Sequence, residues 1–393
     1  MARLRDLGEW SGGNTPSKAN AAYWVDGTIP WVSPKDMKVD EITSSGDRVS
    51  EAALKEGRVS LVPEGSVLIV TRSGILSHTL PVAVTKTPVT INQDLKALSP
   101  KPGVLPKYVA HALRGASRRI LNQCSKHGTT VASIETKGLL DFEIPLVDLD
   151  EQRRIVAEIE KQFSRLDEAV ANLKRVKANL ARCRASSLIR AMGDWPLVPV
   201  GRLCNCIVPN RDKPSEFTGS TPWLTLPDFD DDEIAIGRSR QGLGLSDREI
   251  AASRAKVVPA GSVLMSCVGR FGVTAVLQCS AVINQQLHAF LPSDRVIPVF
   301  LAYALRTRVA EMERKATATT IAYMNKSNCN SISVPLPPLD EQLSIVAEVD
   351  RRLSIVREVE AEVDANLKRA QVLRQAVLAR AFDGAEAAVP FTA

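Results

Sequence analysis

The sequence lacks the features that mark a membrane protein or a nucleotide-using enzyme. No apolar run approaches the roughly 20 residues of a membrane span, and the first residues lack the apolar stretch of a secretory signal. No Gly-Lys dipeptide occurs, which excludes a Walker A phosphate loop. No Asn-Pro-Pro-Tyr or Asp-Pro-Pro-Tyr segment is present, and no Gly-x-Gly-x-x-Gly follows a strand. We therefore expect a cytoplasmic protein without a P-loop, adenine-methylating or dinucleotide site.

Candidate metal ligands and catalytic histidines are also few. The seven cysteines are an odd number, and their only close pair, Cys204 and Cys206, has no second pair or histidine at zinc-site spacing. We expect reduced thiols that fill small core spaces, and no metal site. The four histidines are too scattered for a catalytic triad, and we expect His111, within an amphipathic segment, to be structural.

Length and charge set weaker limits. A chain of 393 residues exceeds what one hydrophobic core usually serves, so two globular units are expected. The net charge of +6, from 50 basic and 44 acidic residues, is compatible with a polyanionic partner but does not identify one.

An internal repeat fixes the organisation of the chain. The segment Pro145–Ile159 returns as Pro335–Val349, and both copies contain Leu-Asp-Glu-Gln followed by Ile-Val-Ala-Glu. The globular parts repeat as well, because Pro63–Leu68 matches Pro259–Leu264. Further pairs match in the same order, namely Ile91–Leu95 with Ile283–Leu287 and Tyr108–Arg114 with Phe300–Arg306. Between these landmarks the halves differ widely.

Each repeat opens a long segment without proline or glycine, at 150–192 and at 340–382. Apolar residues recur there in steps of three and four, which predicts coiled-coil helices of about 60 Å. In the first segment they are Ile155, Ile159, Phe163, Leu166, Val170, Leu173, Val176, Leu180 and Cys183. In the second they are Val346, Val349, Leu353, Val356, Val359, Val363, Leu367, Ala370 and Val377. Glu358, Glu360, Glu362 and Asp364 either face basic residues of the partner helix or form a solvated face.

The predicted fold class is α+β: two similar α/β domains joined by two long antiparallel coiled-coil helices, with pseudo-twofold symmetry. The expected divisions are domain 1 (1–148), the first long helix (149–193), domain 2 (194–338), the second long helix (339–384) and a C-terminal tail (385–393). Within domain 1 the pattern predicts strands at 66–70 and 80–84 and one helix from Pro106 to Arg118.

These motifs resemble the specificity (S) subunits of type I DNA restriction–modification systems. The resemblance rests on the Leu-Pro-Pro-Leu-Asp-Glu-Gln box at 336–342, its weaker copy at 146–152, and the opening Gly12–Ser17, Tyr23-Trp24 and Ile29–Met37. The segments 128–131, 319–321 and 325–327 also resemble the turn-and-strand element that precedes the box in this family. The first copy departs from the pattern, with Val147-Asp148 where the second has Pro337-Pro338.

The resemblance implies a non-catalytic subunit of a DNA methylation and restriction complex. It implies two target-recognition domains that each read one half of a bipartite double-stranded DNA target, and helices that set the spacer. It further implies two DNA adenine methyltransferase (M) subunits as partners, with restriction and motor (R) subunits in the full complex and no membrane. S-adenosylmethionine, ATP and Mg²⁺ are expected on those partners, and no cofactor or metal on this chain.

Candidate DNA contacts are residues that offer donors to base edges or phosphates from loops. In domain 1 they are Lys35, Arg72, Ser73, His78, Lys126, His127, Thr129 and Thr130. In domain 2 they are Arg211, Lys213, Arg240, Arg270, Thr319, Thr320 and Lys326. For each of them, an ordinary solvated surface residue is the alternative interpretation. The matched Trp31 and Trp223 are expected in the core, and the matched Asn92 and Asn284 are expected to be structural.

Two other classes of protein remain open at this point. One is an enzyme whose motifs are unrecognised, which would methylate adenine without a partner. The other is a stand-alone coiled-coil tether or architectural DNA-binding protein, which would not distinguish specific from random duplexes at raised salt.

Overall fold

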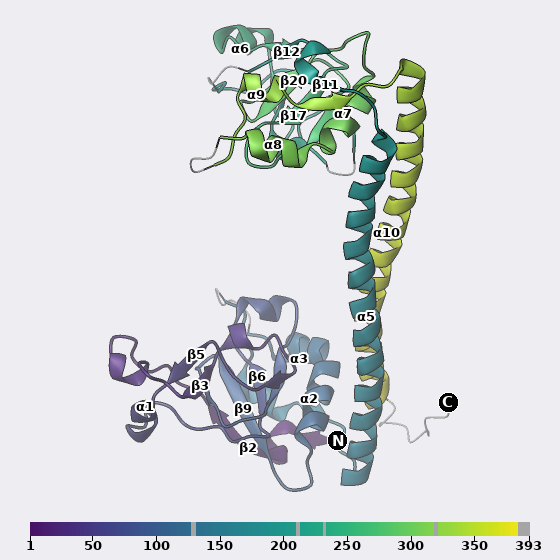
Figure 1. Cartoon of the computed structure of the whole chain (residues 1–393). Coiled ribbons are helices and arrows are strands. Elements are labelled where there is room, and N and C mark those ends of the chain that lie inside the picture. The colour runs from purple at the N-terminus through teal and green to yellow at the C-terminus, as the bar shows by residue number, and fades with distance from the viewer. Residues whose placement is uncertain (127–130, 210–212, 231–232, 318–320, 384–393) are drawn as a thin grey trace. The chain divides into compact units, whose positions relative to one another are not determined.

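The computed structural model describes residues 1–126, 131–209, 213–230, 233–317 and 321–383 (Figure 1). The chain divides into two compact units, and each unit takes part of both long helices. Unit 1 consists of residues 1–172 and 366–393, and unit 2 of residues 173–365. None of the described helices is both long and apolar enough to cross a bilayer.

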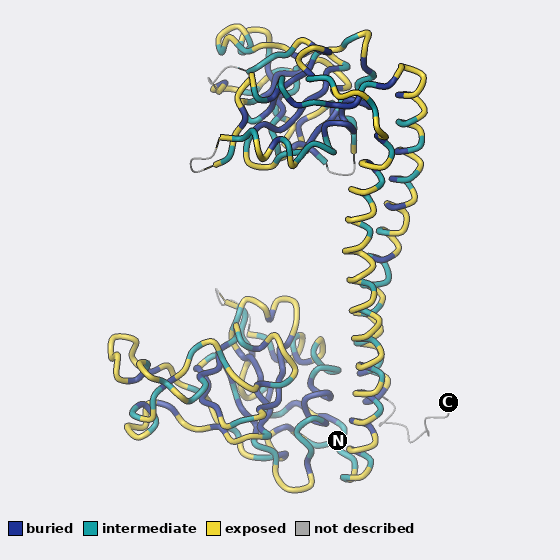
Figure 2. The backbone as a smooth tube through the Cα atoms, in the orientation of Figure 1, coloured by how far each residue is buried: buried dark blue, intermediate teal, exposed yellow. Residues whose placement is uncertain are grey.

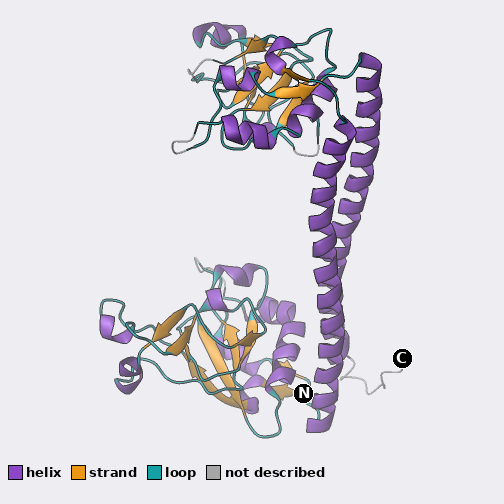
Figure 3. Cartoon of the chain, in the orientation of Figure 1, coloured by secondary structure: helices purple, strands orange, loops and turns teal. Residues whose placement is uncertain are grey.

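Unit 1 is built on a five-stranded sheet and a three-stranded sheet (Figure 3). The larger sheet, in spatial order, contains β2 (Gly8–Gly12), β9 (Leu95–Pro100), β6 (Val67–Val70), β7 (Val82–Thr85) and β4 (Glu41–Ile42). The smaller contains β5 (Asp47–Val49), β3 (Ile29–Val32) and β8 (Thr90–Ile91). A short antiparallel pair joins β1 (Ala2–Arg3) to β10 (Glu143–Ile144), so the two ends of the domain lie together.

Unit 2 repeats this plan. Its five-stranded sheet contains, in order, β12 (Cys206–Ile207), β20 (Leu287–Phe290), β17 (Val263–Ser266), β18 (Thr274–Leu277) and β14 (Ala235–Ile236). A four-stranded sheet contains β15 (Gly244–Leu245), β13 (Thr221–Leu224), β19 (Ala281–Ile283) and β16 (Val257–Val258). The end-joining pair is β11 (Leu197–Pro199) with β21 (Ser333–Pro335).

The helices also correspond between the units. The described part of unit 1 contains α1 (Glu51–Lys55), α2 (Pro106–Gly115), α3 (Ser117–Cys124), α4 (Thr136–Asp141) and the 3-10 helices η1 (Leu4–Leu7), η2 (Ala21–Tyr23), η3 (Pro34–Asp36) and η4 (Gly74–Ser77). Unit 2 contains α6 (Asp247–Ala252), α7 (Pro298–Arg306), α8 (Val309–Lys315), α9 (Lys326–Asn330) and the 3-10 helices η5 (Val200–Arg202) and η6 (Leu226–Asp228). The two long helices are α5 (Leu149–Met192) and α10 (Leu339–Asp383).

The expected strands and long helices are present, but the single helix predicted from Pro106 to Arg118 is wrong. Two helices, α2 and α3, take its place, because Ala116 leaves the helical conformation at ψ 4°. Pro106 and its counterpart Pro298 each begin a helix, where the missing amide hydrogen costs nothing.

Buried residues gather in the globular part of each unit, as the dark blue segments of Figure 2 show, and the main hydrophobic cluster joins strands of the larger sheet to residues of the long helices. In unit 1, Tyr108 of α2 packs its ring 5.3 Å from that of Phe382 of α10, and His111 packs 5.8 Å from Phe163 of α5. Burial of these rings fixes α2 between the sheet and the long helices.

The repeated Pro-x-Gly-Ser-Val-Leu motif has a backbone reason. Gly65 and Gly261 both have φ +79°, a left-handed conformation that side chains other than glycine rarely adopt. Their amides donate to the carbonyls of Thr85 and Leu277, at 2.9 and 2.7 Å. Each glycine therefore makes the turn that starts the central strand of its sheet.

The long helices pack against each other in both units. In unit 2, Lys177 pairs with Asp364 at 2.5 Å and Arg184 pairs with Glu360 at 2.6 Å. Residue numbers rise along α5 as they fall along α10, so the helices run antiparallel there. Of the two interpretations of the acidic stretch, pairing with the partner helix is confirmed for Glu360 and Asp364.

The apolar stripe is not buried along its whole length. Val176, Val359 and Cys183, all predicted in the interhelical contact, are exposed. Ile155, Ile159 and Phe163 are buried, because both α10 and the globular part of unit 1 pack against α5 there. A pair of helices alone covers only part of each helix surface.

All seven cysteines are free thiols. Four of them are buried, as expected: Cys124, Cys204, Cys267 and Cys329. The expectation of core positions is wrong for Cys183 and Cys279, which are exposed. Among the described residues, no group of three or more histidine, cysteine or acidic side chains is arranged to hold a metal ion.

Candidate nucleic-acid interface

Three of the sequence-predicted contacts of unit 1, Arg72, Ser73 and Lys126, lie where three segments meet beyond the central strand β6. The amide of Ser73 donates to the carbonyl of Ala132 at 3.0 Å, and the amide of Lys126 donates to that of Ser133 at 2.8 Å. Residues 131–134 therefore lie between the segment after β6 and the segment after α3. This arrangement brings Arg72, Ser73 and Lys126 together at one end of the sheet.

Unit 2 reproduces the arrangement with different residues. The amide of Gly269 donates to the carbonyl of Ala322 at 2.8 Å, and the amide of Thr317 donates to that of Tyr323 at 2.9 Å. Arg270 follows Gly269 directly, and Lys326 begins α9 three residues after Tyr323. The matched hydrogen bonds show that both units present the same backbone frame.

Two predicted cations of unit 1 are held by carboxylates at the surface. Arg72 Nε lies 2.6 Å from Asp94 Oδ1, and Lys35 Nζ lies 2.7 Å from Asp47 Oδ2. The hydrogen bond from Lys35 to Asp47 raises the pKa of Lys35, which stays charged at neutral pH. Exposed ion pairs of this kind contribute little to stability, so their main effect is to orient the cation.

Arg240 of unit 2 lies beside a polar hollow of about 620 Å³. Its guanidinium pairs with Asp230 at 2.8 Å, and its amide donates to Asp228 Oδ1 at 2.7 Å. Asp228 is buried and also accepts from Ser239 and Thr225, so its oxygens are occupied within the protein. Asp228 is thus a structural residue of the hollow, and its carboxylate is not available to a ligand.

The remaining described candidates are separate surface residues. Lys213 Nζ lies 6.0 Å from the ring centroid of Phe217, and His78 is exposed at the end of η4. Ser73 caps η4 by accepting from the Ile75 amide at 3.5 Å. Six other candidates lie outside the described residues: His127, Thr129, Thr130, Arg211, Thr319 and Thr320.

The matched tryptophans and asparagines have structural positions, as expected. Trp31 and Trp223 are buried in equivalent strands, with 6% and 5% of their surface exposed. Asn92 Oδ1 accepts from the amide of Asp94 at 3.1 Å, and Asn284 Oδ1 accepts from that of Gln286 at 3.1 Å. Both asparagines thus hold the turn before the strand that pairs with the central strand.

Sequence reasoning missed the role of the glutamine in the repeated box. Gln152 is buried, and its amide group donates to the carbonyls of Gly103 and Val147. Its counterpart Gln342 donates to the carbonyls of Arg295 and Pro337. Conservation of the residue between the two halves was the signal, but the sequence did not reveal which backbone groups it joins.

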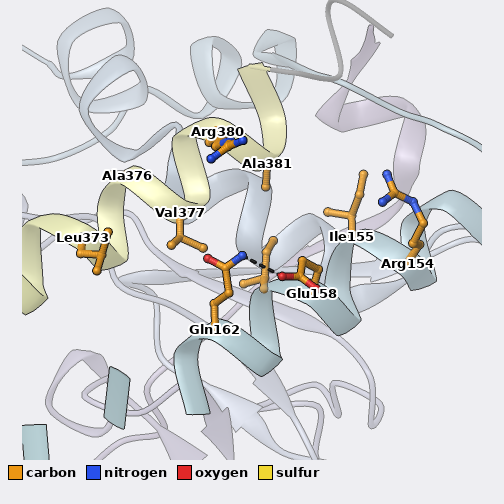
Figure 4. A pocket seen from close by; sticks show the side chains of 10 residues that line it. Arg154, Ile155, Glu158, Gln162, Leu373, Ala376, Val377, Arg380 and Ala381 are labelled. Carbon is orange, nitrogen blue, oxygen red and sulfur yellow. Dashed lines mark hydrogen bonds between the residues drawn. The ribbon is translucent and has the colours of Figure 1, made fainter. Parts of the chain in front are cut away.

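Sequence reasoning also missed a groove on unit 1 between α5 and α10. Its volume is about 200 Å³, and Figure 4 shows side chains of both helices facing it. Its lining consists of Arg154, Ile155, Glu158, Ile159, Gln162, Leu373, Ala376, Val377, Arg380 and Ala381. Gln162 donates to Glu158 at 2.8 Å and, by that bond, lowers the pKa of Glu158. The groove combines an apolar floor with a charged rim.

Two α/β domains of one plan, each packed on the same pair of long helices, define a duplicated recognition protein. Residues 1–180 and 192–365 match the family described as the type I restriction modification DNA specificity domain, and the chain belongs to this family. Specificity subunits of type I restriction–modification systems are non-catalytic. The resemblance drawn from the repeated box is confirmed.

Individual relatives agree with this assignment. The chain is 43% identical over 158 residues to the specificity subunit of a type I restriction enzyme of Escherichia coli. It is 31% identical over 178 residues to a corresponding subunit of Methanocaldococcus jannaschii. These alignments cover 40% and 44% of this chain, and the chain spans only 39% of the length of each relative.

Two solved structures share the fold. One comes from work on complex assembly and conformational transition of a type I restriction–modification system, with a TM-score of 0.76 and 23% identity. The other is the HsdS subunit of Thermoanaerobacter tengcongensis, with a TM-score of 0.59 and 22% identity. The similarities cover 97% and 98% of this chain and 96% of each of those chains. Two α/β domains with packed long helices are thus the fold of the whole chain.

Proposed function

We propose that this chain is the DNA-specificity subunit of a type I restriction–modification complex and that each domain reads one half of a bipartite duplex target. The observation that carries the proposal is the match of both halves to the DNA specificity domain. The shared backbone frame around Ala132 and Ala322 supports it, because a common frame with different side chains suits two different half-sites.

The proposed DNA contacts are the described cations on the two matched backbone frames. Arg72 and Lys126 stand on the frame of unit 1, and Arg270 and Lys326 stand on that of unit 2. Guanidinium and ammonium groups bind phosphates and guanine edges, so these residues would supply affinity for DNA and part of the base recognition. The candidates outside the described residues, His127, Thr129, Thr130, Arg211, Thr319 and Thr320, stay predictions, as do Lys35, Ser73, His78, Lys213 and Arg240.

The proposed partners carry the chemistry. Two DNA adenine methyltransferase subunits would bind S-adenosylmethionine, and restriction and motor subunits would use ATP and Mg²⁺, all in the cytoplasm. In this arrangement the present chain binds DNA and positions the partners, with no catalytic residue of its own.

The groove between α5 and α10 is the proposed docking place for one methyltransferase subunit. Leu373 on its edge is 51% exposed and the neighbouring Val372 is 70% exposed, an apolar surface that a partner segment would cover. Arg154, which is paired with Glu151 at 2.5 Å, and Arg380 place positive charge at the rim, which would attract acidic groups of that segment. Leu373→Asp should prevent co-purification of the methyltransferase, whereas Leu61→Asp, at an exposed position in the globular part of unit 1, should not.

One experiment tests the main proposal. The full chain is co-expressed with a type I methyltransferase subunit that co-purifies with it, and methyladenine is mapped across the genome. The expected result is a single bipartite motif with a fixed gap, which is absent when either protein is expressed alone. Methylation by this chain alone would identify an enzyme, and the absence of any motif from the complex would contradict the proposal.

A further inference from the structure

The segment 321–324 of unit 2 has two faces. Met324 is buried, with 3% of its surface exposed, whereas Ile321 and Tyr323 are 61% and 44% exposed. Successive residues of an extended chain point to opposite sides, so Ile321 and Tyr323, two positions apart, share the outward face. The segment thus turns two large apolar side chains to solvent while it anchors itself through Met324.

The equivalent segment of unit 1 has the same inward face and a different outward one. Ile134 is buried, as Met324 is, and each follows an alanine by two positions. The outward residues are Val131, which is 47% exposed, and Ser133. The residues that hold the segment are therefore alike in the two units, and the residues that it displays differ.

The backbone around Ile321 and Tyr323 is fixed on both sides. Tyr323 exchanges two backbone hydrogen bonds with Thr317, at 2.9 and 3.2 Å, while Ala322 accepts from Gly269. Ile321 Cγ2 lies 3.8 Å from the place that a Cβ atom on Gly269 would take. These hydrogen bonds hold the backbone of residues 322 and 323, and the extended chain puts the side chains of Ile321 and Tyr323 on the exposed face.

We propose that Ile321 and Tyr323 contact the C5-methyl group of a thymine in the major groove of the half-site that unit 2 reads. The inference rests on the proposed function, and it names two residues that specify a base. The thymine methyl is the apolar group that a base edge offers in the major groove, and apolar side chains recognise it. Arg270, beside Gly269, and Lys326, on α9, flank the pair with charges suited to phosphates.

Deoxyuridine, which is thymidine without this methyl group, is the probe. Each thymine of both half-sites, as mapped by methylation, is replaced in turn by deoxyuridine, and duplex binding by the full methyltransferase complex is measured. For the unaltered chain, one replacement in one half-site should weaken binding about fourfold, the effect of one buried methyl group. For the double variant Ile321→Ala, Tyr323→Ala, the same replacement should change binding less than twofold.

Two further variants serve as controls. Val257→Ala removes an exposed apolar side chain from β16 of the same unit and should keep the fourfold sensitivity. Val131→Ala alters the equivalent place in unit 1 and should leave the sensitivity of the unit 2 half-site unchanged. Because Ile321 and Tyr323 are exposed, thermal unfolding of the double variant should match that of the unaltered chain.

The outcomes separate this inference from the function on which it rests. If the complex methylates a bipartite motif but no deoxyuridine replacement weakens binding, or the double variant keeps the same sensitivity, the thymine contact is wrong and the function stands. A methylated motif with no thymine in either half-site would also show that the thymine contact is wrong while the function stands. If no bipartite motif appears at all, the proposed function fails and the inference fails with it.

Discussion

Gln152 Oε1 accepts a hydrogen bond from the backbone amide of Leu105 at 2.9 Å, across 47 residues of sequence. Leu105 is the residue before α2. Gln152, a buried residue of the box that opens α5, therefore also holds the start of α2, the helix that packs on α5. In unit 2, Gln342 Oε1 accepts from the amide of Ile297, before α7, at 2.8 Å. One side chain thus couples two helices in each unit, and its neutral amide does so without burying a charge.

Gln152→Ala should destabilise unit 1, because it leaves the Leu105 amide and two carbonyls without their buried partner. The expected loss is about 1–3 kcal/mol of unfolding free energy. Urea unfolding measures the loss, and hydrogen exchange of the Leu105 amide shows whether α2 opens at its start. Gln371→Ala, at an exposed position of α10, is the control and should change neither quantity.

His111 should make unit 1 less stable in mild acid. Burial, together with the nearby charges of Arg114, Lys107 and Arg374, lowers its pKa from 6.5 to about 3. Between these values the unfolded chain binds a proton that the folded chain does not. The unfolding free energy should therefore fall as the pH decreases below about 6.5, by up to about 1.4 kcal/mol per pH unit.

Comparison with His111→Leu isolates this effect from the titration of carboxylates. The difference in unfolding free energy between the unaltered chain and the variant should change between pH 7.5 and pH 5. The control, His78→Leu, replaces an exposed histidine and should show no such change. A constant difference for His111→Leu over this range would contradict the prediction.

The two ion pairs between the long helices of unit 2 should differ in strength. Arg184 and Glu360 each have 22% of the side chain exposed, whereas Lys177 and Asp364 have 49% and 47%. Solvent screens the more exposed pair, so Glu360→Gln should cost about 1 kcal/mol and Asp364→Asn less than about 0.5 kcal/mol. Thermal unfolding of the two single variants and of the variant with both changes measures the two losses in stability. Equal losses for Glu360→Gln and Asp364→Asn would show that burial does not set the strength of these ion pairs.

If the long helices set the gap between half-sites, longer helices should lengthen it. Four added residues in both α5 and α10 extend each helix by about 6 Å, close to the length of two base pairs. The methylation motif of such a variant should keep both half-sites and gain about two base pairs between them. An unchanged gap would rule out the helices as the ruler.

The sequence determined the duplicated architecture, because short-range patterns of residues specify it. The repeat of Pro145–Ile159 at Pro335–Val349, together with long stretches free of proline and glycine, predicted both helices to within a residue or two. Periodicity and helix-breaking residues act over a few neighbours, so they are legible without tertiary information. The family resemblance depended on the same short motifs.

Tertiary structure decided which residues of those patterns act together. The sequence could not show that Gln152 joins Leu105, that Val176 stays exposed on a predicted apolar stripe, or that Ile321 and Tyr323 face outward. Each of these facts depends on which distant segments pack beside the residue. Contacts between residues far apart in the sequence produce no periodic pattern in the sequence, so they cannot be predicted from it. The architecture is therefore encoded locally, whereas the recognition surface arises from contacts that exist only in the folded chain.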